Sequence, residues 1–297
     1  MINLPVIIEA SEATELWTQL LGMLFYHENV ALTSPRGEPT RELLNVTLCL
    51  RDARRCAINL PIRKLNYHFM VAEWVWIALG YEDLQSISHY NPAISRFSDD
   101  GKTFFGAYGP RWTSQLEYVV RKLREDRDTR QAVCTIWRPN PPGTRDVPCT
   151  IAMQYLIRKD RLHAIVTMRS SDAWLGVPYD VFNFSMLANI VAGEVGIPLG
   201  EVRIQLGSSH MYERNADAAM AILVHDQVYE SPAMPQLPGQ WPAKDAGHWW
   251  QMAEVGHAAV ASSPWHEFLM VLADRARRNP EIVPGPLGEL IRARNAA

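Results

Sequence analysis

The chain has 297 residues, 47% of them hydrophobic, so it can bury a core large enough for one large domain or two ordinary ones. Its net charge of -3 provides no overall basic field, so we expect no nucleic acid as a partner. The four cysteines form no CxxC pair and no zinc-ligand spacing, which argues against a disulfide scaffold and against a metal site.

The first elements of the chain give no targeting or membrane signal. Residues 1–22 contain three glutamates and no basic region of the kind that opens a secretory signal. The longest apolar stretch, Trp74 to Gly80, is too short to cross a bilayer. We therefore expect a cytoplasmic protein that does not associate with membranes.

Strands and helices are both predicted along the chain. Alternating hydrophobicity predicts a strand over 44–50, and apolar residues at helical spacing predict helices over 66–79 and 112–125. The period then changes, and strands are predicted over 132–137, 150–158 and 163–169, with the last two joined as a hairpin across 159–161.

The second half continues with a helix over 181–195 and a strand over 201–206. From residue 232 the chain is proline-rich and then helical around 265–278, and no chemistry is assigned to that part. Because strands and helices mix without a regular βαβ alternation, we predict an α+β fold in which a mixed sheet packs against helices in one domain over 1–297.

Cys149, directly after a proline, is the candidate nucleophile. A lone cysteine is more often a small buried hydrophobe, so spacing alone is weak evidence. The polar residues that follow it within otherwise apolar segments are harder to bury without a ligand. They are Arg169, Ser170, Asp172, Asp180, His210 and Tyr212.

The order and spacing of several motifs resemble the thymidylate synthase family. The motifs are Tyr108-Gly109-Xaa-Arg111-Trp112, Pro148-Cys149, Gln154, Arg169-Ser170-Xaa-Asp172-Xaa-Xaa-Leu175-Gly176-Xaa-Pro178, and His210-Xaa-Tyr212. Glu73, seven residues before Gly80, resembles the family's helical catalytic glutamate. The resemblance is strongest over 36–217 and the part over 232–297 diverges; it implies a single catalytic domain of that family.

The resemblance implies a covalent mechanism centred on Cys149. Its sulfur would attack C6 of a pyrimidine nucleotide, so that C5 captures the one-carbon unit of 5,10-methylenetetrahydrofolate. A covalent adduct divides one hard step into easier ones, and Arg169 is the candidate cation that lowers the thiol pKa. Glu73 and Tyr108 would transfer protons through water, and Glu73, among apolar neighbours, should titrate near neutrality.

The same resemblance implies the binding residues and a homodimer. Phosphate would be held by Arg36, by Arg169 with Ser170, and by two adjacent arginines lent by the partner subunit. Those two positions are Arg130 and Gln131, so one arginine is missing, at a cost of about 1.5 to 3 kcal/mol unless another group replaces it. The remaining implied contacts are His210 and Tyr212 with a sugar hydroxyl, Gln154 with the nucleotide, and Asp172, Gly176 and Glu73 with the folate.

Asp180 determines the predicted base. Ordinary thymidylate synthases have an asparagine there, which suits uracil, whereas the exocyclic amine of cytosine needs an acceptor that a carboxyl group provides. This residue marks the cytidylate hydroxymethylase branch of the family, which adds water to the methylene group instead of taking hydride from folate. Thr150, in place of the family's histidine, is a second change in the polar groups that face the base and supports the same branch. The charged C-terminal stretch over 287–297 agrees with entry of water.

The sequence therefore predicts a hydroxymethyltransferase acting on CMP or dCMP. It leaves ribose and deoxyribose open. The Arg-rich, Lys-poor composition favours CMP, and the family resemblance then implies a role in a nucleoside-antibiotic pathway. The nearest alternative is a thymidylate synthase or a dUMP hydroxymethylase that tolerates Asp180. More distant alternatives are a thiol hydrolase built on Cys149, His210 and an aspartate, and a nucleotide-binding regulator without turnover.

Overall fold

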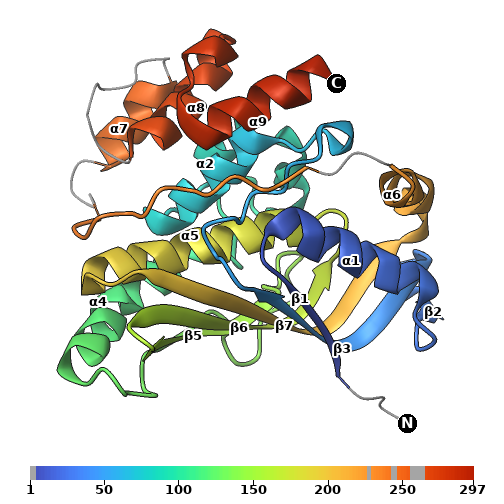
Figure 1. The fold of residues 1–297 in the computed structure, drawn as a ribbon, viewed down its shortest axis with the longest axis horizontal. Helices are drawn as coiled ribbons and strands as arrows, with labels where there is room; N and C mark the ends of the chain where they lie inside the picture. Colours follow the sequence, from blue (N-terminus) through green and yellow to red (C-terminus); the bar gives the residue numbers. More distant parts are fainter. Residues whose placement is uncertain (1–4, 226–228, 242–245, 255–264) are drawn as a thin grey trace.

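The computed structural model describes residues 5–225, 229–241, 246–254 and 265–297 and is built on one mixed sheet (Figure 1). The strands run in the order β1-β3-β7-β6-β5-β4, and β2 pairs with β3. β1 is parallel to β3 and β6 to β7, and the other neighbours are antiparallel. The strands are β1 Val6–Ala10, β2 Ala31–Thr33, β3 Thr40–Leu50, β4 Val133–Thr135, β5 Thr150–Arg158, β6 Arg161–Asp172 and β7 Leu199–Tyr212.

The described helices lie on one side of the sheet (Figure 1). The α1, α4 and α5 helices form the layer nearest the strands, α2 packs on α5, and α8 packs on α2. The helices are α1 Ala13–Tyr26, α2 Tyr67–Ala78, α3 Leu84–Ser88, α4 Gly109–Glu125, α5 Val177–Val195, α6 Ala216–Leu223, α7 Ala246–Glu254, α8 His266–Arg277 and α9 Gly285–Ala296. This architecture confirms the predicted α+β class with a mixed sheet.

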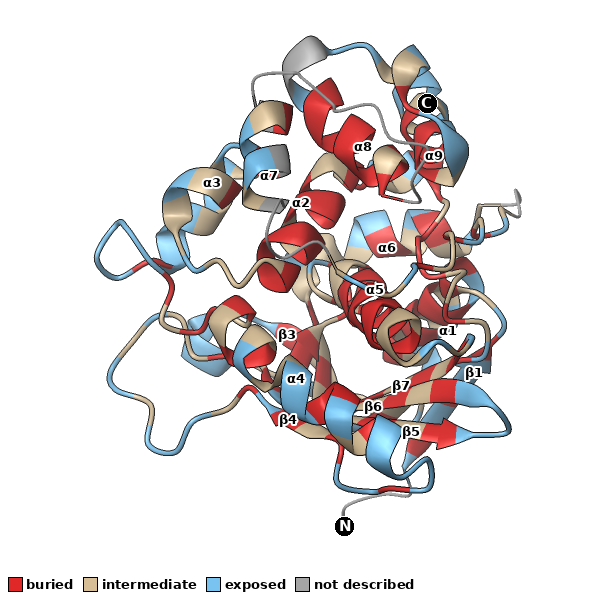
Figure 2. Cartoon of the chain, turned by 90° about the vertical axis from the view of Figure 1, so that its left-hand side faces the viewer, coloured by how far each residue is buried: buried red, intermediate tan, exposed pale blue. Residues whose placement is uncertain are grey.

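The α5 helix lies at the centre of the core (Figure 2). Its residues are buried almost all round, from Val177 to Ala192, because the sheet covers one side and α2 the other. It ends at Gly196, whose φ of 79° lets its backbone N–H turn back to the Ala192 carbonyl at 2.9 Å. Polar side chains on this helix are therefore held in a rigid, largely dry environment.

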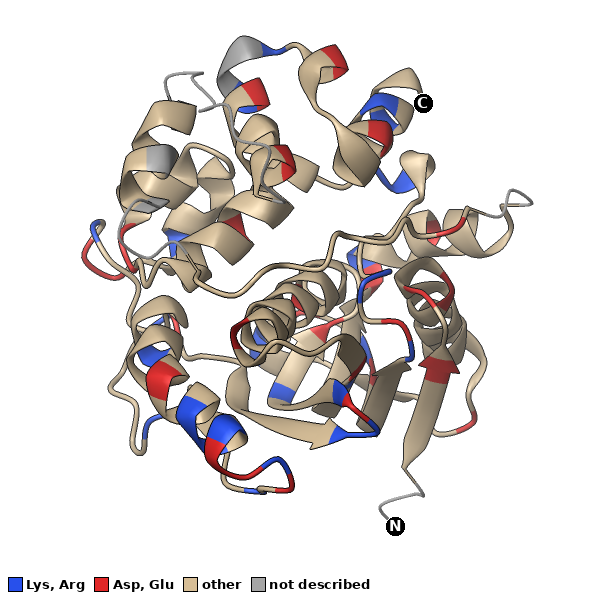
Figure 3. Cartoon of the chain, turned by 60° about the vertical axis from the view of Figure 1, so that its left-hand side comes forward, with Lys and Arg blue, Asp and Glu red and all other residues tan. Residues whose placement is uncertain are grey.

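The α4 helix is amphipathic in the way the sequence predicts. Val119, Val120 and Leu123 are buried, while Arg121 and Lys122 pair with Glu125 on the outer face. Basic and acidic residues lie side by side on this helix (Figure 3). Because Glu117 and Glu125 flank the basic residues at 121, 122 and 124, this face carries no continuous basic stripe.

Several predicted elements match closely. The strand over 150–158 coincides with β5, and Lys159 and Asp160, with φ of 50° and 54°, make the tight turn of the hairpin. The helices predicted over 66–79 and 112–125 correspond to α2 and α4, and that around 265–278 contains α8.

Other elements are longer than predicted, or were not predicted. The strand over 201–206 is the middle of β7, which continues to Tyr212, and the helix over 181–195 already begins at Val177. The α1 helix and β1 near the N-terminus have no counterpart in the predictions. Within the described residues, no helix has the length and apolar character needed to span a membrane.

Candidate active site

Three strand ends bring the candidate residues together. The β5 strand starts directly after Cys149 and runs antiparallel to β6, so its first residue lies opposite Met168, near the end of β6. The β7 strand is parallel to β6, which sets Asp172 opposite His210. Cys149, the 169–172 segment and the His210-Xaa-Tyr212 pair therefore meet at one end of the sheet.

Cys149 lies partly exposed beside Ser170, with 3.9 Å between its sulfur and the serine hydroxyl oxygen. Arg169 donates to the carbonyl oxygens of Val147 at 2.9 Å and Pro148 at 3.0 Å, and to Ser170 at 3.0 Å. Burial raises the pKa of the Cys149 thiol, and the nearby charge of Arg169 offsets this only in part. Arg169 thus has the predicted sign of effect, but burial is the larger influence.

Glu73 projects from α2 towards α5 and is held by an asparagine. The Asn183 amide donates to Glu73 Oε2 at 2.7 Å. Burial raises the pKa of Glu73 to about 7, the Asn183 bond opposes this, and the charge of Asp180 adds to it. The expectation that this carboxyl group titrates near neutrality is in agreement with the structure.

Asn183 was missed in the sequence analysis. It is 4% exposed, and its amide oxygen has no hydrogen-bond partner among the described residues. It lies three residues after Asp180 on the same face of α5, within an otherwise apolar run. An asparagine at that spacing from a candidate site residue was the available signal.

Asp180 lies in the first turn of α5 and accepts a hydrogen bond from the Ser171 hydroxyl at 2.7 Å. Burial raises its pKa to about 7, although the Ser171 bond lowers it. The site therefore contains two carboxyl groups, Glu73 and Asp180, that change protonation state near physiological pH. Perturbation of this kind is concentrated at functional sites.

Tyr108 and Thr150 face each other across the start of β5. The Tyr108 hydroxyl accepts from the Thr150 backbone N–H at 3.2 Å, and burial raises the Tyr108 pKa well above its usual value. The Thr150 hydroxyl is buried and has no hydrogen-bond partner in the described part of the chain.

Asp172 organises the turn between β6 and α5. Its Oδ1 accepts from the backbone N–H groups of Trp174 at 2.8 Å and Leu175 at 2.9 Å, while its buried Oδ2 has no partner within the described ranges. A Cβ atom on Gly176 would lie 3.0 Å from the Ser171 hydroxyl oxygen, which explains a glycine at this close approach. Buried polar atoms normally have partners, so the free oxygens of Asp172, Thr150 and Asn183 are available to hydrogen-bond a ligand bound here.

His210 and Tyr212 point to the same face of β7, with ring centroids 5.7 Å apart. Arg36, in the short turn Pro35–Gly37, donates to the Tyr212 hydroxyl at 3.4 Å. Burial lowers the pKa of His210, so its imidazole is neutral at physiological pH. These three residues lie together at the end of β7.

Gln154 and Arg130 lie apart from this cluster. Gln154 alternates with the buried residues Met153 and Tyr155, so its side chain faces the other side of the sheet. Its amide donates to the Arg130 carbonyl oxygen at 2.9 Å, and the Arg130 side chain is exposed. Neither residue joins the Cys149 cluster within one chain.

The fold and the site together define an α+β domain with a thiol at the centre of its candidate active site. The family model described as thymidylate synthase matches residues 36–240, and the chain belongs to the thymidylate synthase family. This confirms the family resemblance of the motifs.

Two similar curated proteins are phage enzymes named deoxyuridylate hydroxymethyltransferase. That of Bacillus phage SP01 is 30% identical over 222 residues, which cover 68% of this chain and 57% of the relative. That of Pseudomonas phage M6 is 33% identical over 177 residues, covering 56% of this chain and 50% of the relative. The chain thus spans little more than half the length of these relatives.

A third relative is a putative thymidylate synthase of Methanococcoides burtonii. It is 26% identical over 219 residues, which cover 73% of this chain and 94% of the relative. The similarity therefore extends both to proteins named as methylating enzymes and to proteins named as hydroxymethylating enzymes.

Proposed function

We propose that this protein is a C5 hydroxymethyltransferase that converts CMP or dCMP to the 5-hydroxymethyl nucleotide, with 5,10-methylenetetrahydrofolate and water as co-substrates. Asp180 carries the proposal. Its carboxyl group, with a pKa of about 7, can offer an acceptor to the exocyclic amine of cytosine and a proton to the ring nitrogen beside it. The Ser171 bond fixes the carboxyl group in one orientation.

The covalent steps are assigned to the residues around Cys149. Its sulfur bonds to C6 as the C5=C6 double bond opens, and C5 becomes the nucleophile for the one-carbon unit that methylenetetrahydrofolate supplies when bound. Tyr108 accepts the C5 proton through water as the bond between the methylene carbon and the folate nitrogen breaks, so that tetrahydrofolate leaves and an exocyclic methylene group remains on C5. Glu73 takes a proton from the water whose oxygen adds to the C5 methylene carbon, and Cys149 leaves as C5=C6 re-forms.

The binding residues follow the same assignment. Arg36, Arg169 and Ser170 bind phosphate, and His210 with Tyr212 binds the sugar. The unpartnered Oδ2 of Asp172 and the close turn at Gly176 suit the folate, whose ring nitrogens offer donors to a buried carboxylate.

We further propose a homodimer that lends Arg130 across the interface. Gln154 alternates with buried residues of β5 and so lies on the face of the sheet that the described helices leave uncovered, and its amide bonds to the backbone carbonyl of Arg130, whose side chain is exposed. An exposed arginine beside that face is available to the phosphate of a second chain in a homodimer. Gln131, beside it, supplies no second charge.

Hydroxymethylation of dUMP is the second candidate, because two similar phage proteins bear that name. C5-tritiated CMP, dCMP and dUMP separate the candidates. We expect tritium release from a cytosine nucleotide that depends on methylenetetrahydrofolate, and a product in which a hydroxymethyl group has replaced the C5 hydrogen. Preference for dUMP, or a methylated product, would replace the proposal with one of its alternatives.

A further inference from the structure

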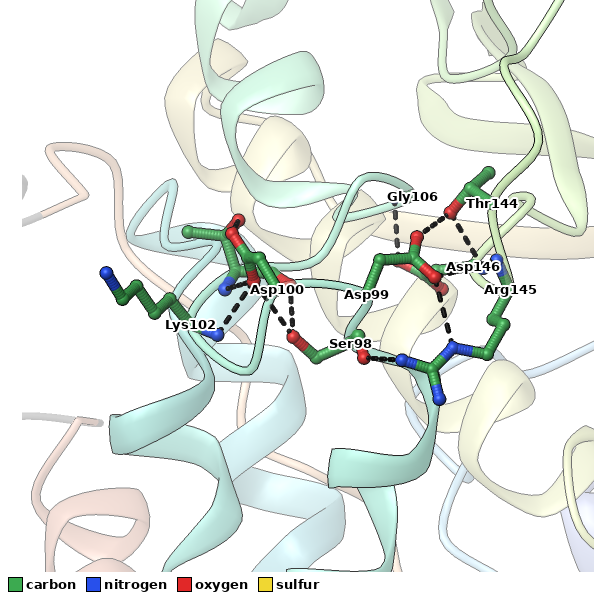
Figure 4. Close-up of polar contacts among 9 residues, drawn as sticks. Ser98, Asp99, Asp100, Lys102, Gly106, Thr144, Arg145 and Asp146 are labelled. Carbon is green, nitrogen blue, oxygen red and sulfur yellow. Dashed lines mark hydrogen bonds and ion pairs between the residues drawn. The ribbon is translucent and has the colours of Figure 1, made fainter.

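The chain that leads into Cys149 is held residue by residue, although it belongs to no helix or strand. We call residues 144–148 the approach segment. The Thr144 hydroxyl donates to Asp99 Oδ2, and Arg145 donates to Asp99 Oδ1 from its backbone N–H at 3.2 Å and from Nε at 3.1 Å (Figure 4). A single carboxylate on a distant loop therefore accepts three hydrogen bonds from the start of the segment.

The rest of the approach segment is attached in the same way. Asp146 Oδ2 accepts from the Gly106 backbone N–H at 2.7 Å (Figure 4). Arg169 then holds the carbonyl oxygens of Val147 and Pro148, the last two residues before Cys149. The nucleophile candidate is thus at the end of a continuous series of anchored residues.

The approach segment is attached to the loop over 98–108, which has hydrogen bonds of its own. Asp100 closes its own turn by accepting from the backbone N–H groups of Lys102 and Thr103, both at 2.7 Å. A Cβ atom on Gly106 would lie 2.4 Å from the Asp146 carbonyl oxygen, so the two backbones are in direct contact. The same loop ends at Tyr108. Its hydroxyl accepts a hydrogen bond from the backbone N–H of Thr150, the residue that follows Cys149.

We propose that Asp99 is a positioning residue, which acts through the approach segment to fix the Cys149 sulfur relative to Tyr108 and Asp180. Exposed ion pairs contribute little to folding stability. The pair of Asp99 and Arg145 is partly exposed, with side-chain exposures of 42% and 61%, so its main consequence is local order rather than stability of the whole chain. The effect on turnover rests on the proposed function, whereas the effect on the Cys149 thiol does not.

The test compares Asp99→Ala with Asp160→Ala. Asp160 also pairs with an exposed arginine, Arg127, at 2.9 Å, but it lies in the hairpin turn at the opposite end of β5 from Cys149. For Asp99→Ala we expect kcat for C5 tritium release to fall about 10- to 100-fold, because a misplaced reacting atom is costly, with KM little changed. Alkylation of Cys149 by iodoacetamide should become faster, because a loosened segment exposes the sulfur to water.

A fall in kcat together with faster alkylation of Cys149 alone distinguishes a positioning role from loss of the fold. Peptide mass spectrometry identifies which cysteine is alkylated. Cys49, Cys56 and Cys134 are buried in the folded protein, so alkylation of all four cysteines would indicate unfolding. A second pair, Thr144→Val and Thr144→Ser, removes and restores one hydroxyl group; the serine variant should recover both rates.

Two outcomes overturn the inference, and another concerns only the proposed function. If Asp99→Ala and Asp160→Ala alkylate at the same rate, or if Thr144→Ser behaves as Thr144→Val does, Asp99 does not position the thiol. If the unmodified protein releases no tritium from any of the three nucleotides, the proposed function fails, and the alkylation rates still decide the inference.

Discussion

Replacement of Asp180 by asparagine is the sharpest test of base selection. The side chains have nearly the same shape, and the Ser171 hydroxyl, 2.7 Å from Oδ2, can bond to either of them. The substitution removes the acid that we assign to the amine edge of cytosine. It also removes a negative charge that raises the pKa of Glu73 and of Cys149.

The magnitude follows from the hydrogen bond that is lost. A bond to a charged group contributes about 1.5 to 3 kcal/mol, which corresponds to a fall of about 10- to 150-fold in kcat/KM for CMP or dCMP. Without the charge of Asp180, the Glu73 pKa should fall below its value of about 7. The low-pH limb of the rate profile should therefore move to lower pH, since Glu73 acts as a base.

The assay is tritium release from C5-tritiated CMP, dCMP and dUMP, measured across pH with saturating methylenetetrahydrofolate. Ser171→Ala is the matched control, because it removes the hydroxyl partner but keeps the carboxyl group, and so should keep the preference for cytosine. The reasoning is refuted if Asp180→Asn uses cytosine nucleotides as well as the unmodified protein does.

Three further predictions concern other parts of the site. Asn183→Ala removes a hydrogen bond that favours the Glu73 carboxylate, so the low-pH limb of the rate profile should move to higher pH by about one unit or more. If this limb does not move, Asn183 does not tune the proton transfer by Glu73. Arg36→Ala should raise KM for the nucleotide about 10- to 150-fold and leave weak turnover of the free nucleoside unchanged, as competition assays with both can show. If Arg130 is lent across a dimer, mixing inactive Arg130→Ala and Cys149→Ser chains should restore about a quarter of full activity, because half of the dimers then contain one intact site. Sedimentation measures whether the dimer forms. A dimer that recovers no activity would contradict the shared site.

The sequence was informative where periodicity and motifs coincide. The alternation in β5 placed Cys149 directly before a strand, the helical spacing in α2 placed Glu73 on a helix, and apolar neighbours were enough to predict the raised pKa of Glu73. The stretch of β7 over 207–209 was not predicted, because Gly207, Ser208 and Ser209 are small and lack the apolar alternation of a half-buried strand. Their strand structure depends on pairing with β3 and β6.

Contacts between distant segments were beyond the reach of the sequence. Nothing in the spacing of Asp99 and Thr144 predicts that they meet, since 45 residues separate them. The net effect on the Cys149 thiol was equally hidden, because it depends on how burial compares with the charge of Arg169. Gln154 belongs to a family motif. Its position in β5 turns its side chain to the sheet face opposite Met153 and Tyr155, where it bonds to the Arg130 carbonyl, and the motif alone does not predict this contact.

The arrangement around Cys149 is unfavourable for stability, and this is the strongest physical argument that it serves chemistry. Burial raises the pKa of Glu73 and of Asp180 from ordinary values of 4.5 and 3.8 to about 7. For such groups the contribution to the free energy of unfolding is fully present below the ordinary pKa. This contribution is lost as pH rises through about 7, so neither carboxyl group stabilises the fold at neutral pH. A protein that only needed a stable core would have apolar residues at both positions, whereas a site that passes protons between water and a pyrimidine ring needs carboxyl groups poised near neutrality.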